Sequence, residues 1–303
     1  MKNPKQFLSL TSLEVEEFEL LLKTFQPLWE RYYRSRTLEG NYRKHPAIKE
    51  HGNAVLQGTG QKLFFLLVYL KTNSLQEHQA ASFGVSQSKV SRIARTLLSI
   101  LEQALKNMKL LPWRDGGTLH KQLAGHKDKV FSYDGTDRSI ERNVDQGAQK
   151  VDFSGKHYGH KVKNLLLSDD GQYIHYMSPT FPGSTHDKAI ANEFPIVLPP
   201  NSVLRQGSGF IGHAPEGVLI EQPFKKPRNG ELTFAQKLFN KILASVRVVI
   251  EHANSGVKRI KIVKDKIRVH TTEIRDCVMF VACGLHNLRV KNPNRGYVSC
   301  VHA

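Results

Sequence analysis

The stretch Lys129-Val130-Phe131-Ser132-Tyr133-Asp134-Gly135-Thr136 decides the fold of the second half of this chain. Its first five residues form a short apolar run, which predicts a strand. A strand that ends in Asp-Gly-Thr presents the Asp134 carboxylate at the C-terminal edge of a sheet, a usual place for ligand and metal sites. Alone this is weak evidence, because Asp-Gly is also a common turn.

More strands and then helices follow this stretch. The turn Ser168-Asp169-Asp170-Gly171 separates two runs that predict a β-hairpin. Thr233 and Gln236 have capping-box spacing at the start of a helix that reaches about Ser255, and another helix covers about 272–290. Strands followed by helices predict an α/β domain. The further strands are expected at residues 161–167, 173–177, 203–204 and 217–220.

The first 115 residues are expected to be helical, with a helix-turn-helix near their end. A short helix from about Leu75 to Phe83 is followed by Gly84 and by a long helix with Ser86 as its N-cap. One face of the long helix is apolar, and the other is polar and basic over its first turns. Such a face can reach base edges and neutralise phosphates in DNA. The apolar face comprises Val90, Ile93, Ala94, Leu97, Leu98, Leu101 and Leu105, and the DNA-binding face Gln87, Ser88, Lys89, Arg92 and Arg95.

An ordinary amphipathic hairpin with a solvated basic face explains the same local pattern. The segment Pro112–Gly117 breaks the helical pattern and is interpreted as the region between two domains. We therefore expect a helical DNA-binding domain over residues 1–115 and an α/β domain over residues 116–303.

Composition and charge narrow the class of protein. The chain has 303 residues, of which 40% are hydrophobic, enough for a sizeable core. We find neither a run near the ~18 apolar residues of a membrane span nor a signal peptide, so we expect an intracellular protein without a membrane partner. Lys and Arg number 44 and Asp and Glu 27, a net charge of +17. Such a charge favours a polyanionic partner, usually nucleic acid.

Two other carboxylates stand in settings that suggest chemistry. Asp187 leads into a short helix, where an acidic residue near the N-terminus is stabilising in any case. Glu251 lies among Val248, Val249 and Ile250, so we expect it to be partly buried and to need a cation or a metal ion. The alternative is an ordinary surface pair with Arg247 at i, i+4.

The order of motifs resembles that of DDE-type insertion-sequence transposases, a lineage related to the Harbinger transposases. Arg247, Glu251 and Lys258 match the spacing of the R-E-K signature around the third carboxylate of many of these enzymes, although Ala244 stands where a tyrosine is frequent. The other matching motifs are Asp134–Thr136, Tyr158–Lys163, Pro182–Ser184 with His186-Asp187, Gly209–Gly212, Pro223–Pro227 and Leu285–Arg289. The resemblance covers about residues 130–290.

This resemblance implies an RNase H-like catalytic domain after the helix-turn-helix. In the family, two aspartates and a glutamate hold two divalent ions, usually Mg²⁺ or Mn²⁺, which serve cleavage and joining of phosphodiesters. Asp134 and Glu251 are then two of the three metal ligands. DNA phosphates are the implied partners of several basic residues, whose alternative is a solvated surface. These residues are Lys225, Lys226, Arg228, Arg247 and the run 258–268, which includes Lys258 and Arg259.

The chain departs from the family at its second aspartate. Relatives place that residue two positions before a Gly-Phe or Gly-Tyr, and here the position before Gly209-Phe210 is Gly207, which has no side chain to bind a metal. Three explanations stay open. The copy has lost cleavage but kept DNA binding; Asp187 supplies the missing oxygen; or the position is misaligned or the protein serves only as a DNA-binding factor.

The resulting hypothesis is a transposase that binds the terminal inverted repeats of a mobile element and a target DNA. Joining two ends implies a homodimer or a larger assembly on double-stranded DNA, and a nucleoid or cytoplasmic location in a prokaryote. The alternative is a sequence-specific DNA-binding protein derived from a transposase and lacking nuclease activity.

Overall fold

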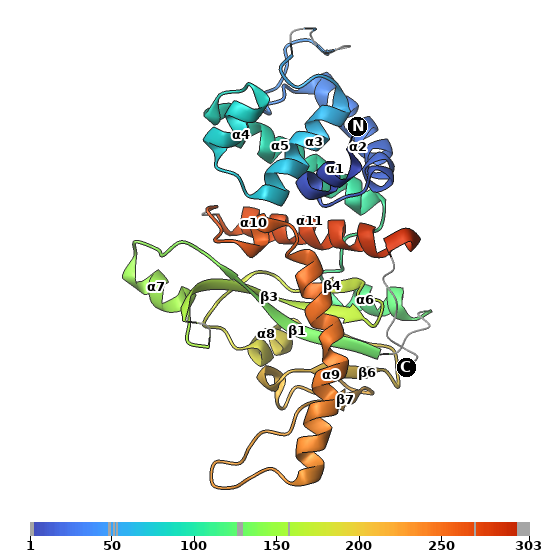
Figure 1. The fold of residues 1–303 in the computed structure, drawn as a ribbon, viewed down its shortest axis with the longest axis vertical. Helices are drawn as coiled ribbons and strands as arrows, with labels where there is room; N and C mark the ends of the chain where they lie inside the picture. The colour runs from blue at the N-terminus through green and yellow to red at the C-terminus, as the bar shows by residue number, and fades with distance from the viewer. Residues whose placement is uncertain are drawn as a thin grey trace. The chain divides into compact units, whose positions relative to one another are not determined.

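The computed structural model describes residues 3–47, 50, 52, 54–125, 130–156, 158–269 and 271–295. They form two compact units (Figure 1). The helical unit consists of Met1–Leu111, Lys258–Asp265 and Cys277–Asn292. The sheet unit consists of Pro112–Val257, Lys266–Asp276 and Pro293–Ala303.

The described strands of the sheet unit form one mixed sheet. Its order is β2-β3-β1-β6-β7, with β4 and β5 also paired to β3. β1 runs antiparallel to β3 and parallel to β6, and β7 continues the parallel side. The strands are β1 (Val130–Ser139), β2 (Phe153–Ser154), β3 (Gly159–Asp169), β4 (Ile174–Met177), β5 (Phe181–Pro182), β6 (Val203–Gln206) and β7 (Leu219–Glu221).

Strand β1 is longer than the sequence predicts. It does not end at Asp134 but continues to Ser139, because β3 extends beside it and pairs Asp137 with Lys163. Its parallel partner β6 is shorter, and the last pair of that ladder joins Tyr133 to Gln206. Asp134 is therefore paired with β3 in the middle of that strand pair. On the side of β6 it lies one residue beyond the last paired residue, Tyr133.

Helices lie on both faces of β1. Phe131 and Tyr133 are fully buried in an apolar cluster that also takes residues from α6 (Gly116–Leu123) and α8 (Asp187–Glu193). Side chains alternate along a strand, so Ser132 and Asp134 point to the other face. There α9 (Phe234–Val257) contacts β1 and crosses the sheet in Figure 1. The predicted Thr233–Gln236 capping box is present, with both hydrogen bonds formed. The remaining elements of this unit are α7 (Gln146–Asp152) and the 3-10 turns Ser208–Phe210 and Pro293–Arg295.

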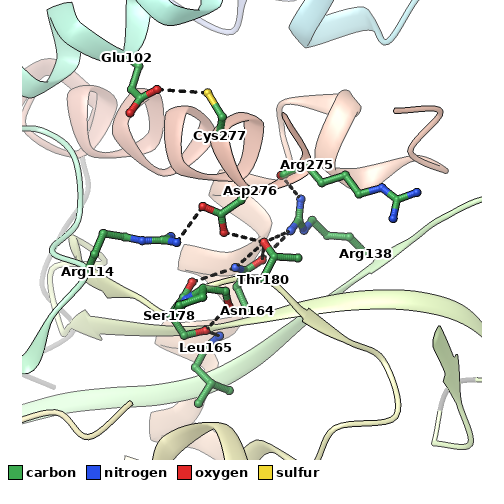
Figure 2. Close-up of polar contacts among 11 residues, drawn as sticks. Glu102, Arg114, Arg138, Asn164, Leu165, Ser178, Thr180, Arg275, Asp276 and Cys277 are labelled. Carbon is green, nitrogen blue, oxygen red and sulfur yellow. Dashed lines mark hydrogen bonds and ion pairs between the residues drawn. The ribbon is translucent and has the colours of Figure 1, made fainter. Parts of the chain in front are cut away.

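Arg138, a buried arginine near the end of β1, bonds to three other segments of the sheet unit (Figure 2). The guanidinium of Arg138, 1% exposed, donates to the carbonyl oxygen of Arg275 at 2.7 Å and to Asn164 Oδ1 at 2.6 Å. It also donates to Thr180 Oγ1 at 3.1 Å. Thr180 in turn donates to Asp276, which accepts from Arg114. A charge removed from water this completely is stable only because several polar groups satisfy it.

The segment interpreted as a linker is part of the sheet unit. Trp113 forms a parallel bridge with Tyr176: its N–H donates to the His175 carbonyl at 2.7 Å, and its carbonyl accepts from Met177 N–H at 3.0 Å. It therefore extends the sheet beside β4. Asp115 caps α6 through Thr118 N–H.

The helical unit combines the segment up to Leu111 with two later segments, Lys258–Asp265 and Cys277–Asn292, whereas the sequence predicts a continuous domain up to residue 115. Arg289 donates to Ser12 Oγ, and Asn287 Nδ2 donates to the Leu110 carbonyl at 2.8 Å. Cys277 Sγ donates to Glu102. The helices are α1 (Pro4–Thr11), α2 (Val15–Ser35), α3 (Gly58–Thr72), α4 (Gln76–Phe83), α5 (Gln87–Asn107), α10 (Lys261–Lys264) and, from Cys277 on, α11 (Thr272–Val290).

Arg138→Met should lower the free energy of unfolding by at least about 3 kcal/mol, because it leaves buried acceptors without their charged donor. The matched control is Arg142→Met, which removes an exposed arginine whose one side-chain partner among the described residues is Gln149, and it should change stability by less than about 0.5 kcal/mol. Urea unfolding measures both. Equal losses of unfolding free energy in the two variants would contradict the conclusion that the buried hydrogen bonds of Arg138 stabilise the sheet unit.

Candidate active site and nucleic-acid interface

Asp134 is held by two residues of α9. Arg247 Nη2 lies 3.6 Å from Asp134 Oδ1, and Asn254 Nδ2 donates to Asp134 Oδ2 at 3.3 Å. The two residues are seven apart (254 − 247 = 7), which places them on one face of a helix. The Asp134 side chain is 27% exposed and that of Arg247 20%. The pair is therefore half-buried between β1 and α9.

Gly207 lies next to this pair. It follows Gln206, the last β6 residue paired with Tyr133, so Gly207 and Asp134 are neighbours past the end of the same ladder. A Cβ at Gly207 would lie 3.1 Å from Arg247 Nη2. Its backbone, with φ −81° and ψ 173°, is extended and open to any residue. Backbone geometry therefore does not require glycine, and an aspartate here would point toward Arg247.

Glu251 differs from the sequence prediction. Its side chain is exposed, and it has no hydrogen bond or ion pair to another described residue. The apolar Val249 and Ile250 are buried, but a helix turns by about 100° per residue, so neighbours in sequence face different directions. The alternative surface pair with Arg247 is also wrong, because that guanidinium pairs with Asp134. Lys258 follows the last residue of α9, Val257, and is grouped with the helical unit.

Asp187 points to the other side of β1. Its Oδ1 accepts from Lys163 Nζ at 3.0 Å, and Lys163 also lies 3.9 Å from Asp137. A Cβ at Gly135 would lie 2.9 Å from Asp187 Oδ1. Gly135 and Asp134 point to opposite faces of the strand. Asp187 therefore packs against the backbone behind Asp134, with its charge balanced by Lys163.

The electrostatics of Asp134 are dominated by burial. Burial raises the pKa of the Asp134 carboxyl above its ordinary value of 3.8, and the charge of Asp187 raises it too. Arg247 and, less strongly, Lys156 lower it. Because the pKa is higher in the folded state, ionisation of Asp134 costs stability as the pH rises from 3.8 through that raised pKa.

These carboxylates, as they stand, do not fit a two-metal centre. Divalent ions of this kind need several hard oxygen ligands around one point. In the described part of the chain, no three His, Cys, Asp or Glu side chains are grouped so that they could hold a metal ion. Asp134 faces a guanidinium, Glu251 faces solvent, and Gly207 has no side chain.

The predicted faces of the long helix α5 are confirmed. All seven residues of the predicted apolar face are buried. Gln87, Ser88, Lys89, Arg92 and Arg95 are all exposed. Gly84 takes a left-handed conformation at φ 65° between α4 and α5, which glycine adopts without strain. The helical unit therefore presents a polar, basic surface at the start of α5.

The other predicted DNA contacts fall in different settings. Lys225 and Arg228 are exposed before α9, and Lys226 there forms an ion pair with Glu231. Arg259 is exposed in the helical unit, where its carbonyl accepts from Lys71 Nζ at 2.8 Å. Arg247 is occupied by Asp134, which argues against the predicted phosphate contact in this state.

Asn254 is a site residue that the sequence analysis missed. Its only signal is the spacing of seven from Arg247, since an asparagine in a helix has no charge to draw attention. Lys163 is a second such residue, because its ion pairs depend on strand pairing that the local sequence does not specify.

None of the described helices is both long and apolar enough to cross a membrane.

Comparison with known proteins points to one family. The family model described as "DDE superfamily endonuclease" matches residues 133–287, and the one described as "Helix-turn-helix of DDE superfamily endonuclease" matches residues 56–107. A curated protein of Microchaete diplosiphon, "Probable transposase for insertion sequence element IS702", is 25% identical over 213 residues, 68% of this chain and 72% of its own length. No solved structure matches significantly. Together with the mixed sheet, these matches confirm the predicted fold class.

The pKa of Asp134 should rise further in Arg247→Gln, because the guanidinium stabilises the ionised carboxylate. Lys156→Gln is the matched control and should raise it less, and Asp187→Asn should lower it. NMR titration of the aspartate carboxyl carbon measures all three. A pKa that falls in Arg247→Gln would contradict the observed pairing.

Proposed function

Because this chain belongs to the DDE superfamily endonucleases, we propose that it is a DNA transposase that binds the ends of a mobile element, with metal-dependent cleavage and strand transfer impaired at Gly207. The observation that carries the impairment is the arrangement of Asp134, Arg247 and Gly207. A guanidinium contacts the first carboxylate and faces the position where the family has its second.

DNA binding is supported by the exposed start of α5. Its residues Gln87 to Arg95 offer amide and hydroxyl groups for base edges and cations for phosphates. The net charge of +17 adds a long-range attraction to any DNA. Under this proposal the partners are the terminal inverted repeats and a target duplex. Two copies of the chain assemble on the two ends inside the cell.

A second candidate is a DNA-binding protein of the same family without nuclease activity. The specific observation in its favour is that Arg247 supplies the positive charge next to Asp134 that a metal ion supplies in an intact site. This side chain compensates Asp134 without any ion. Such a protein binds DNA equally well with and without divalent cations.

The decisive variant is Gly207→Asp. The backbone accepts an aspartate, and its nearest neighbour, the end of the flexible Arg247 side chain, can move. We expect the variant to bind Mn²⁺ at least about tenfold more tightly than the unaltered chain, because a second carboxylate then stands beside the Asp134–Arg247 pair. Gly207→Asn is the matched control of the same size without the charge. Titration calorimetry with Mn²⁺ measures the affinity, which Asp134→Ala should abolish.

Cleavage and strand transfer are then measured on DNA that carries the element ends, with Mg²⁺ or Mn²⁺. The proposal expects activity in Gly207→Asp, little in the unaltered chain, and loss of the restored activity in Gly207→Asp with Glu251→Gln. Full activity of the unaltered chain would show that Gly207 does not impair it. Tight Mn²⁺ binding without any cleavage in Gly207→Asp would favour the second candidate.

A further inference from the structure

A small hairpin follows α2 in the helical unit. Arg36 and Tyr42 form an antiparallel bridge, Thr37 N–H donates to the Asn41 carbonyl at 2.8 Å, and Gly40 N–H donates to the Thr37 carbonyl at 3.0 Å. Gly40 has φ 96°, a backbone conformation that residues other than glycine rarely adopt. We call residues 36–43 the arginine hairpin. It lies outside both segments that match the family models.

Both arginines of the hairpin are held in place by aromatic rings. The Arg36 guanidinium lies 4.0 Å from the centre of the Tyr42 ring and donates to the Tyr42 hydroxyl. The Arg43 guanidinium lies 4.2 Å from the Tyr33 ring centre, and its Nε donates to the carbonyls of Tyr33 and Arg36, each at 3.0 Å. Such stacking orients a guanidinium without neutralising its charge.

The hairpin and its flanks carry unbalanced positive charge. Residues 34–45 contain four basic side chains and one acidic one, Glu39, for a net +3 with His45 neutral (4 − 1 = 3). In the described part of the chain, none of the four has an ion pair with an acidic side chain. Tyr42 is 75% exposed although it is a large aromatic residue. The four basic residues are Arg34, Arg36, Arg43 and Lys44.

The hairpin also borders the proposed DNA-reading helix. A Cβ at Gly40 would lie 3.7 Å from Thr96 Oγ1 of α5. One surface pocket of about 330 Å³ is lined by Arg43 of the hairpin and by Lys89 and Ile93 of α5. The hairpin therefore lies beside the first turns of α5. All these residues belong to the helical unit.

We propose that the arginine hairpin, together with Arg34 and Lys44 at its two ends, binds backbone phosphates of the duplex whose bases α5 contacts. A planar guanidinium matches a phosphate through its N–H donors, and two such groups in a hairpin that lines a pocket together with α5 extend the positive surface of that helix along the duplex. The inference rests on the proposed DNA binding by α5 but adds a second element to it. Contacts of this kind fix the register of a protein on DNA without reading sequence.

The test compares the salt dependence of DNA binding in the full chain. The variant Arg36→Gln with Lys44→Gln removes two charges next to the predicted phosphates. The matched control, Lys5→Gln with Lys106→Gln, removes two exposed charges from α1 and from the far end of α5. Fluorescence anisotropy with a short duplex of arbitrary sequence measures the affinity between about 50 and 200 mM salt.

Each phosphate contact contributes about 0.9 to the slope of log affinity against log salt, so the hairpin variant should lose up to about 2 and the control almost nothing. If Arg36→Gln perturbs folding, Arg34→Gln with Lys44→Gln changes only exposed side chains and should also flatten the slope. Slopes equal to that of the unaltered chain in the folded hairpin variants would overturn the inference alone. Failure of the unaltered chain to bind the duplex at low salt would overturn the proposed function and the inference together.

Discussion

The unequal length of two neighbouring strands is the constraint on which the rest of the candidate site depends. β6 stops at Gln206, paired with Tyr133, while β1 runs on beside β3 to Ser139. Beyond Tyr133, β1 is no longer paired with β6. There the Asp134 side chain contacts Arg247 and Asn254 of α9. The parallel pairing also sets Gly207 next to Asp134, although the 72 residues 135–206 lie between them in the sequence. A carboxylate in this position is costly unless a positive charge compensates it.

Arg247 provides that compensation, because its guanidinium lies 3.6 Å from the Asp134 carboxylate. In a site with two facing carboxylates, mutual repulsion would require a cation from outside. With glycine at 207, one carboxylate remains, and one guanidinium from the same unit suffices. Lys163 does the same for Asp187 on the other side of β1. The charges of this region thus balance internally, and a single substitution changes that balance.

Sequence reasoning succeeded where structure is local. The two faces of α5 follow from helical periodicity, and the capping box at Thr233 from a spacing of three residues. It failed where partners are distant. The apolar sequence neighbours of Glu251 predict that it is partly buried, but it is exposed, because burial on a helix depends on which face meets the sheet. The Trp113 bridge and the Arg247–Asp134 pair depend on tertiary contacts that no local pattern reports.

The helical unit is built from segments far apart in the sequence, which affects when it can fold during translation and how it responds to truncation of the gene. Its packing needs residues 277–292, whose side chains bond Ser12, Glu17 and Leu110. During synthesis the first helices leave the ribosome long before these partners exist, so the unit is completed only after residue 292 has been translated. A stop codon anywhere in residues 112–276 would remove them. We therefore expect substitutions within the sheet unit to leave the helical unit intact, whereas a shortened gene would not.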